Sequence, residues 1–253
     1  MTLAQEQIDT FWRDGYLPIG KVLEDEELAP LRAAYDAEFD AAGTRGHFRN
    51  LSAPRESSDT DAGAATTVER QMLQIMQMCE RSMPFRKLIH DDRLLDIVED
   101  IIGPNIQLFH DQALNKLPRT GGPIHWHQDN AYWKCRPATL VSIWMTLDDV
   151  DVDNGAMQVI PGSHLTPVEH GSAAGGALLE IGDAINTSAA VSVDLPAGGC
   201  MLHHCQTFHH TRPNDTERPR RAFAIHCMTP GTRNASGDIM HVSFGRPMLR
   251  MRA

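Results

Sequence analysis

The spacing of hydrophobic residues changes along the chain, from a helical period in the first part to a strand period in the second. Leu3, Ile8 and Phe11 recur at helical spacing and Gly15 follows them, which predicts a first helix that ends there. "YLPIGKVL" then predicts a short strand, and the stretch from Glu24 to Gly43 predicts a second helix. A further helical pattern runs from Val68 to Ile102.

Two segments of this first part need their own interpretation. "QMLQIMQM", inside the last helical pattern, predicts core packing rather than contact with a cofactor. Residues 43–67 are small, polar and aperiodic, which fits either a lid over a site or plain disorder. Arg45, Arg49 and Arg55 stand out there; the pattern favours a solvated loop over closure on an anionic substrate.

After Gly103 and Pro104 the chain consists of short β-rich runs bounded by Gly, Pro, Asn and Asp. Several short strands after a helical third predict an α+β or mainly β fold, with the sheets forming a sandwich or open barrel. We see no internal repeat and no linker. The sequence therefore predicts one domain over residues 1–253, in which a helical part (about 1–103) buttresses a β core (about 104–230).

Composition narrows the classes of partner. The 253 residues carry a formal net charge of -10, which argues against nucleic acid or an anionic membrane as the main partner. No run of about 18 apolar residues appears. The five cysteines are odd in number and show no CxxC spacing, which favours reduced thiols and a cytoplasmic location.

The segment "HWHQDNAYW" carries the first sign of chemistry. It places His125, His127 and Asp129 at alternate positions, and alternate residues of a β-strand project from one face. Two histidines and one carboxylate around a metal with open positions are typical of non-haem Fe(II) oxygenases. A ligand from elsewhere is then needed, and "MLHHCQTFHHTRPNDTERPRRAFAIHCM" offers His203, His204, His209, His210 and His226.

Three blocks of the sequence resemble a known family. "WHQD", "NGAMQVIPGSH" and "FHHTRPNDTERPRRA" look like blocks of the phytanoyl-CoA dioxygenase family of Fe(II)/2-oxoglutarate-dependent oxygenases. An HxD motif alone is weak evidence, but several blocks in the same order and spacing, from Asn105 to Met228, are specific. The resemblance implies a double-stranded β-helix, the cupin-like jelly roll, with the metal in its open mouth.

The resemblance also implies roles for individual residues. The catalytic metal ligands would be His127, Asp129 and His209. The contacts with 2-oxoglutarate would be Arg220, Thr211, Trp144 and Asn115. Arg220 would bind the distal carboxylate, because a guanidinium binds a carboxylate in a planar two-point fashion. If Asn115 points inward, then Asp111 and Ala113 share its face and become candidate substrate contacts.

The implied reaction uses Fe(II), 2-oxoglutarate and O2, releases succinate and CO2, and hydroxylates an unactivated C–H bond of a small metabolite. Related halogenases replace the metal-binding carboxylate with a small residue. Because Asp129 is present, hydroxylation, desaturation or ring closure is favoured over halogenation. The sequence chooses neither the substrate nor the oligomeric state, and it leaves a homodimer open.

Two other functions remain as alternatives. A site of His125, His127 and His209 would resemble cupin-type dioxygenases that do not use 2-oxoglutarate, and a jelly roll without turnover would be a small-molecule-binding protein. Strand alternation sends His210 and Arg221 to the opposite face from their neighbours His209 and Arg220. The remaining assignments place His203 and His204 in the core or on the surface, His164 in a turn, and Trp126 in packing, while Trp133 is a candidate for the substrate pocket.

Overall fold

The computed structural model describes residues 1–45, 48–51, 70–168, 170–172, 179–180 and 185–252. The α-helices of these residues are α1 (Gln5–Asp14), α2 (Asp25–Arg45), α4 (Met78–Arg81), α5 (Met83–Leu88), α6 (Asp92–Ile102) and α7 (Asp129–Trp133), and the 3-10 turns are η2 (Ser163–Leu165) and η4 (Thr187–Ala189). The strands are β1 (Tyr16–Lys21), β2 (Arg49–Asn50), β3 (Leu73–Met76), β4 (Ile106–Lys116), β5 (Ile124–His127), β6 (Val141–Thr146), β7 (Met157–Val159), β8 (Gly171–Ser172), β9 (Leu179–Glu180), β10 (Val191–Val193), β11 (Gly199–His204), β12 (His209–Thr211), β13 (Arg220–Met228) and β14 (Met248–Arg250).

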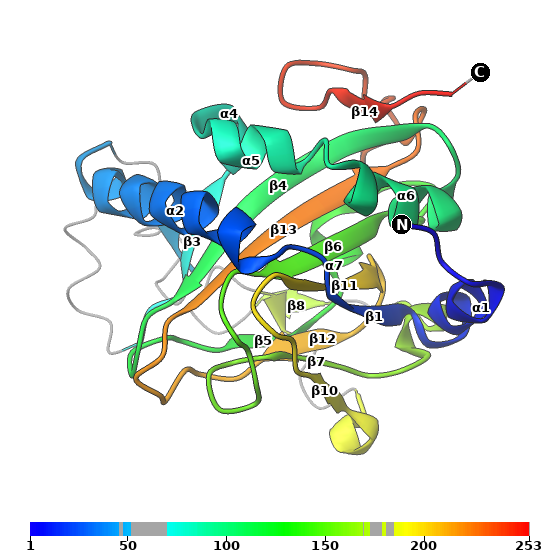
Figure 1. Cartoon of the computed structure of the whole chain (residues 1–253). Coiled ribbons are helices and arrows are strands. Elements are labelled where there is room, and N and C mark those ends of the chain that lie inside the picture. The colour runs from blue at the N-terminus through cyan, green and yellow to red at the C-terminus, as the bar shows by residue number, and fades with distance from the viewer. Residues whose placement is uncertain (46–47, 52–69, 169, 173–178, 181–184, 253) are drawn as a thin grey trace.

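Two antiparallel sheets form the β core (Figure 1). The large sheet has the order β1-β11-β6-β13-β4-β3-β2, with β14 added to β4, and the small sheet has the order β10-β7-β12-β5. Strands that are distant in sequence are neighbours in both sheets, as β4 and β13 are over their whole length. This interleaving of early and late strands is the arrangement that a jelly roll requires.

Helices cover the outer face of the large sheet. In Figure 1, α2, α4, α5 and α6 lie along the β4–β13–β6 side, and the small sheet lies on the other side. Phe85 of α5 packs on Phe223 of β13 with 4.7 Å between the ring centroids. Ala224 and His226 of the same strand face the opposite way and line a cavity. The central strands are therefore buried on both faces, which is why they read as nearly continuous apolar runs.

The first helix ends where the sequence predicts. Gly15 has φ +79°, and a Cβ atom placed there would lie 2.4 Å from Nδ1 of His164. Glycine is thus required both by the backbone conformation and by the close approach of this imidazole. His164 lies in the turn η2 and its Nε2 lies 3.1 Å from the carbonyl oxygen of Trp12, so the turn assignment agrees with the structure.

The first part of the chain contains more strand than the sequence predicts. "QMLQIMQM" forms strand β3 on the edge of β4 rather than a helix. Since β1, β2 and β14 also join the large sheet, the sheet extends beyond the predicted range of about 104–230. Residues 43–67, for which the sequence left a lid and plain disorder open, fall mostly outside the described residues.

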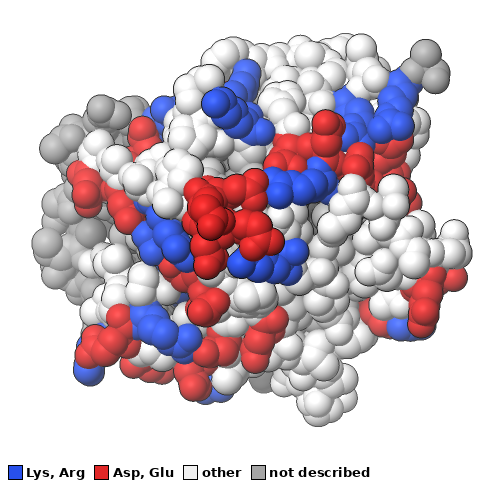
Figure 2. Space-filling model, viewed as in Figure 1, with Lys and Arg blue, Asp and Glu red and all other residues white. Residues whose placement is uncertain are grey.

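Charge on the face shown in Figure 2 is mixed, with basic side chains lying beside acidic ones. Arg93, for example, pairs with both Glu27 and Asp91, and Arg250 pairs with acidic residues of α6. Among the described helices, none combines the length and the apolar character needed to cross a membrane.

Candidate metal and co-substrate site

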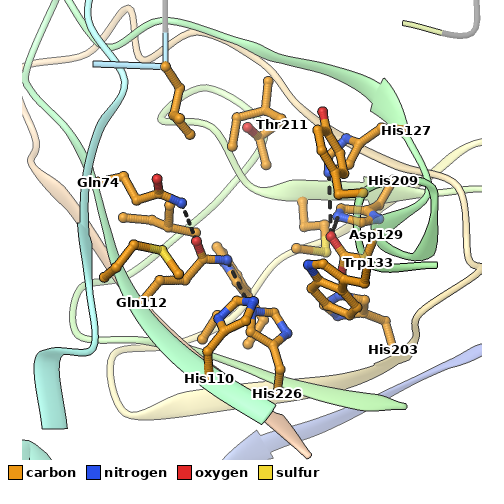
Figure 3. A pocket seen from close by; sticks show the side chains of 18 of the residues that line it. Gln74, His110, Gln112, His127, Asp129, Trp133, His203, His209, Thr211 and His226 are labelled. Carbon is orange, nitrogen blue, oxygen red and sulfur yellow. Dashed lines mark hydrogen bonds and ion pairs between the residues drawn. The ribbon is translucent and has the colours of Figure 1, made fainter. Parts of the chain in front are cut away.

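A cavity of about 360 Å³ opens between the two sheets, with side chains from both in its lining. The small sheet and α7 contribute His127, His209 and Asp129 to one side. Strands β3, β4 and β13 of the large sheet contribute Gln74, Gln112, His110 and His226 to the side across from them (Figure 3). We call the first group, together with His203, the metal wall, and the second group the facing wall.

Three groups of the metal wall converge as predicted. One ligand atom each from His127, Asp129 and His209 lies within 4.8 Å of the other two, and all three residues are buried. His127 and His209 are direct partners in the β5–β12 pairing, which brings their ring centroids to 4.1 Å. A set of two imidazoles and one carboxylate at this separation is able to hold a single divalent metal ion.

Asp129 reaches this position by a different route from the predicted one. Strand β5 ends at His127, and Asp129 is the first residue of α7, so the turn between strand and helix, not strand alternation, brings the carboxylate beside the imidazoles. The prediction that the three alternate residues share one strand face is therefore wrong. His125 is exposed and does not line the cavity, which removes the geometric basis for a three-histidine site.

Backbone carbonyls fix the orientation of both imidazoles. Nδ1 of His127 lies 2.7 Å from the carbonyl oxygen of His125, and Nδ1 of His209 lies 3.0 Å from that of Thr207. Since a carbonyl only accepts, each Nδ1 carries a proton, which leaves each Nε2 as the atom available to a metal ion, 3.7 Å from Oδ1 of Asp129. Burial lowers the pKa of His209 to about 3, which keeps this imidazole neutral, as metal binding requires.

His203 completes the metal wall and was not predicted as part of the site. Its Nε2 lies 3.2 Å from Oδ2 of Asp129, the oxygen not directed at His127 and His209. Burial alone would raise the pKa of the Asp129 carboxyl, but its electrostatic surroundings, which include the hydrogen bond that Nε2 of His203 donates to Oδ2, hold that pKa well below its ordinary value. The carboxylate is thus charged and oriented by a neighbour on β11.

The other end of the cavity is cationic. Arg220 is fully buried, its Nη1 donates to the carbonyl oxygen of Leu114 at 3.2 Å, and its guanidinium lies 5.5 Å from the centre of the Trp144 ring. Within the described part of the chain, its Nε and Nη2 and the Oγ1 of Thr211 have no hydrogen-bond partner. Burial lowers the pKa of Arg220 to about 10, so the group remains charged at neutral pH. A buried guanidinium with unused donors is suited to a carboxylate.

Lys116 supports this end of the cavity from behind. It is the direct partner of Arg220 in the β4–β13 pairing, and its Nζ donates to the carbonyl oxygens of Gly122 at 2.5 Å and Arg212 at 2.6 Å. Burial and the neighbouring guanidinium lower the pKa of Lys116 well below its ordinary value. The residue therefore braces the backbone next to Thr211.

The structure does not place Asn115 in the cavity. Asn115 pairs with Arg221, on the helix-facing side of the large sheet, whereas its neighbour Leu114 lines the cavity. Asp111 and Ala113 share the face of Asn115, as predicted, but Asp111 accepts from the backbone N–H of Cys79 and Ala113 packs in the helix-covered core. The predictions that Asn115 contacts 2-oxoglutarate and that Asp111 and Ala113 contact substrate are therefore wrong.

Strand alternation correctly separates two pairs of neighbours. His210 turns away from the cavity and stacks on Trp126, with 5.1 Å between the ring centroids. Arg221 pairs with Asp148 and Asp36 on the helix-covered face. Trp133 and Arg49 line the cavity, whereas Arg55 lies outside the described residues.

Two curated proteins similar to this chain are named as dioxygenases. The probable alpha-ketoglutarate-dependent hypophosphite dioxygenase of Stutzerimonas stutzeri is 29% identical over 145 residues, which cover 54% of this chain and only 50% of that protein. The ectoine dioxygenase of Halomonas elongata is 28% identical over 248 residues, 88% of this chain and 70% of that protein.

The fold is shared with a solved enzyme. The crystal structure of a non-heme alpha-ketoglutarate-dependent carbocyclase from nogalamycin biosynthesis matches with a TM-score of 0.79 at 20% identity, over 97% of this chain and 96% of that one. This confirms the predicted jelly roll with helices. The profile of the phytanoyl-CoA dioxygenase (PhyH) family matches residues 11–222, so the predicted resemblance is confirmed and the chain belongs to that family.

Proposed function

We propose that the chain works as a dioxygenase dependent on Fe(II) and 2-oxoglutarate, with His127, Asp129 and His209 as the iron ligands and Arg220 as the anchor of 2-oxoglutarate. When bound, iron and 2-oxoglutarate activate O2, so that one oxygen atom enters the substrate as hydroxyl and the other enters succinate, with loss of CO2. Family membership supports this class of reaction.

One observation carries the proposal. The cavity has a cluster of two imidazoles and a carboxylate on one side and, in the same space, a buried guanidinium with unused donors. A metal site without a co-substrate has no use for the buried guanidinium. A dicarboxylic acid that binds the metal at one end has a second carboxylate at the other end, and that carboxylate needs a cation. This pairing also argues against a cupin-type enzyme that works without 2-oxoglutarate.

The protein's own groups contribute position and exclusion of water. The Nδ1 atoms of His127 and His209 donate to the carbonyl oxygens of His125 and Thr207, which fixes the orientation of both rings. His203 donates to the second oxygen of Asp129. Arg220 and Thr211 offer hydrogen-bond donors for a carboxylate. Apolar side chains between the two polar ends exclude water from the reacting groups, and these are Leu114, Ile124, Trp144, Met157 and Ala224.

The substrate belongs to the class of small molecules. The names of the two curated relatives refer to hypophosphite and ectoine, both small metabolites. The cavity volume of about 360 Å³ lies at the lower end of the range for ligand pockets, and 2-oxoglutarate would occupy part of it. We also propose that residues 1–253 form a single domain.

The experiment compares two adjacent histidines. Anaerobic addition of Fe(II) and 2-oxoglutarate to the wild-type protein should give a weak visible charge-transfer band, and His209→Ala and Asp129→Ala should abolish it. His210→Ala, which changes the neighbour outside the cavity, should keep the band. A folded wild-type protein without the band, or equal loss in both histidine variants, would contradict the proposal.

A further inference from the structure

The facing wall contains a continuous chain of hydrogen bonds (Figure 3). Nε2 of Gln74 donates to Oε1 of Gln112, and Nε2 of Gln112 lies 3.0 Å from Nε2 of His226. An amide nitrogen only donates, so Nε2 of His226 is the acceptor and carries no proton. The proton of this imidazole is therefore on Nδ1, which lies 2.6 Å from Oγ of Ser142 and donates to it.

The four side chains of the facing wall are uncharged, and the cationic Arg49 lines the cavity beside them. His226 is neutral because its Nε2 accepts a hydrogen bond, and burial lowers the pKa of His110 to about 4. Among the described residues in the cavity lining, Asp129 supplies the carboxylate, and it belongs to the proposed metal site. An organic cation in this space would find no free negative charge, and such burial is costly.

Some polar atoms of the facing wall are left without partners. Oε1 of Gln74 and Nδ1 of His110 are buried and have no hydrogen-bond partner among the residues that the structure describes. Gln74 is 8% exposed and lines the cavity, and its Nε2 uses one of two N–H groups on Gln112. The same planar amide thus presents an unused acceptor and an unused donor. Buried polar groups in this state need a partner, and a ligand is able to supply one.

We propose that the facing wall recognises the substrate, and that it selects an uncharged amide or lactam group, which pairs with the side-chain amide of Gln74. The proposal rests on the proposed function, because it places the substrate across the cavity from the metal ligands. The fixed chain from Gln74 through Gln112 to His226 and Ser142 holds the recognising amide in one orientation. His110 lies beside His226, with 4.4 Å between the ring centroids, and adds a second polar contact.

The first experiment uses matched compounds on the wild-type protein loaded with Fe(II) and 2-oxoglutarate. Lactams and primary amides are compared with carboxylic acids and amines of the same carbon skeletons. The amide members should perturb the charge-transfer band under anaerobic conditions and stimulate succinate release once O2 is admitted, and the acids and amines should do so at least about tenfold more weakly. Preference for the acids or amines, or no response to any amide, would overturn the proposal.

The second experiment uses three variants. Gln74→Met removes the amide at nearly constant volume and should weaken binding of the amide probe at least about tenfold, measured as the perturbation of the band. Gln74→Glu should shift the preference toward the amine of the same skeleton. Gln158→Met is the matched control, because Gln158 follows the cavity-lining Met157 on β7 and alternates to the other face.

The outcomes separate the two proposals. If wild type gives no band with Fe(II) and 2-oxoglutarate, the proposed function itself fails. If the band forms in wild type and in Gln74→Met, and both bind the amide probe equally well, only the role of the facing wall fails. Thermal unfolding of each variant shows whether a loss comes from misfolding.

Discussion

Both walls of the cavity carry enclosed histidines, but the hydrogen bonds of those histidines end in different places. In the metal wall, His127 and His209 give their Nδ1 protons to backbone carbonyls, and His203 bonds to Asp129. The atoms left over are the two Nε2 atoms and one carboxylate oxygen, which converge on one point. The protein's own hydrogen bonds thus orient the side chains of the metal wall, and one metal ion would satisfy the atoms that remain.

The facing wall is satisfied only in part. Its bonds run from side chain to side chain, and they leave Gln74 Oε1 and His110 Nδ1 without described partners. The difference shows how one cavity serves two kinds of ligand. Hydrogen bonds to the backbone preorganise the metal wall for one kind of ion. Hydrogen bonds between side chains preorganise the facing wall, and a few substitutions there would change its ligand specificity.

The largest expected effect concerns the cationic end of the cavity, where we propose that Arg220 binds 2-oxoglutarate rather than substrate. Arg220→Leu should raise the apparent KM for 2-oxoglutarate by about a hundredfold or more, because loss of one partner of a buried charge pair costs about 3–5 kcal/mol. Arg221→Leu, on the helix-covered face, should leave that KM within a few-fold of wild type. An equal rise in the two variants would show that Arg220 acts through stability alone.

The residues of this end were predicted from the resemblance to the family, whose blocks carry His209, Thr211 and Arg220 on one short segment. The structure brings these side chains and Trp144 to one cavity. Strand alternation also placed His210 and Arg221 on the far faces. Strand alternation predicts which residues face the cavity once one cavity-facing residue of the strand is known.

The inward position expected for Asn115 was wrong, and Gln74 was missed because its segment was predicted as helix. Both faces of β4 are buried, one under helices and one on the cavity, so its apolar pattern does not say which face is inward. The short strand β3 lies within "QMLQIMQM", a segment rich in methionine and glutamine, which favour helix, and its pairing with β4 makes it a strand. His203 was missed because its face follows from the pairing of β11 with β6, which is set by tertiary structure.

A smaller effect tests whether the metal wall is preorganised by His203. His203→Leu should weaken the binding of Fe(II), or of Co(II) as a spectroscopic probe, by about ten- to a hundredfold, which is typical for loss of an outer partner of a metal ligand. His203→Asn keeps a donor and should recover part of the affinity. Anaerobic metal titration measures both, and thermal unfolding checks the fold. Equal metal affinity in the Leu variant and wild type would remove His203 from this role.

The smallest effect concerns the neutrality of the facing wall. Burial lowers the pKa of His110 to about 4 in the folded state, whereas an unfolded histidine titrates near 6.5. The unfolded chain therefore binds more protons as pH falls below about 6.5, and stability declines until the folded group also titrates near pH 4. Between about pH 7 and about pH 5.5, His110→Gln should lose about 1 kcal/mol less unfolding free energy than wild type, measured by urea denaturation. His241→Gln changes an exposed histidine and should follow the wild-type pH dependence; if His110→Gln follows it too, the facing wall does not hold His110 in its neutral form.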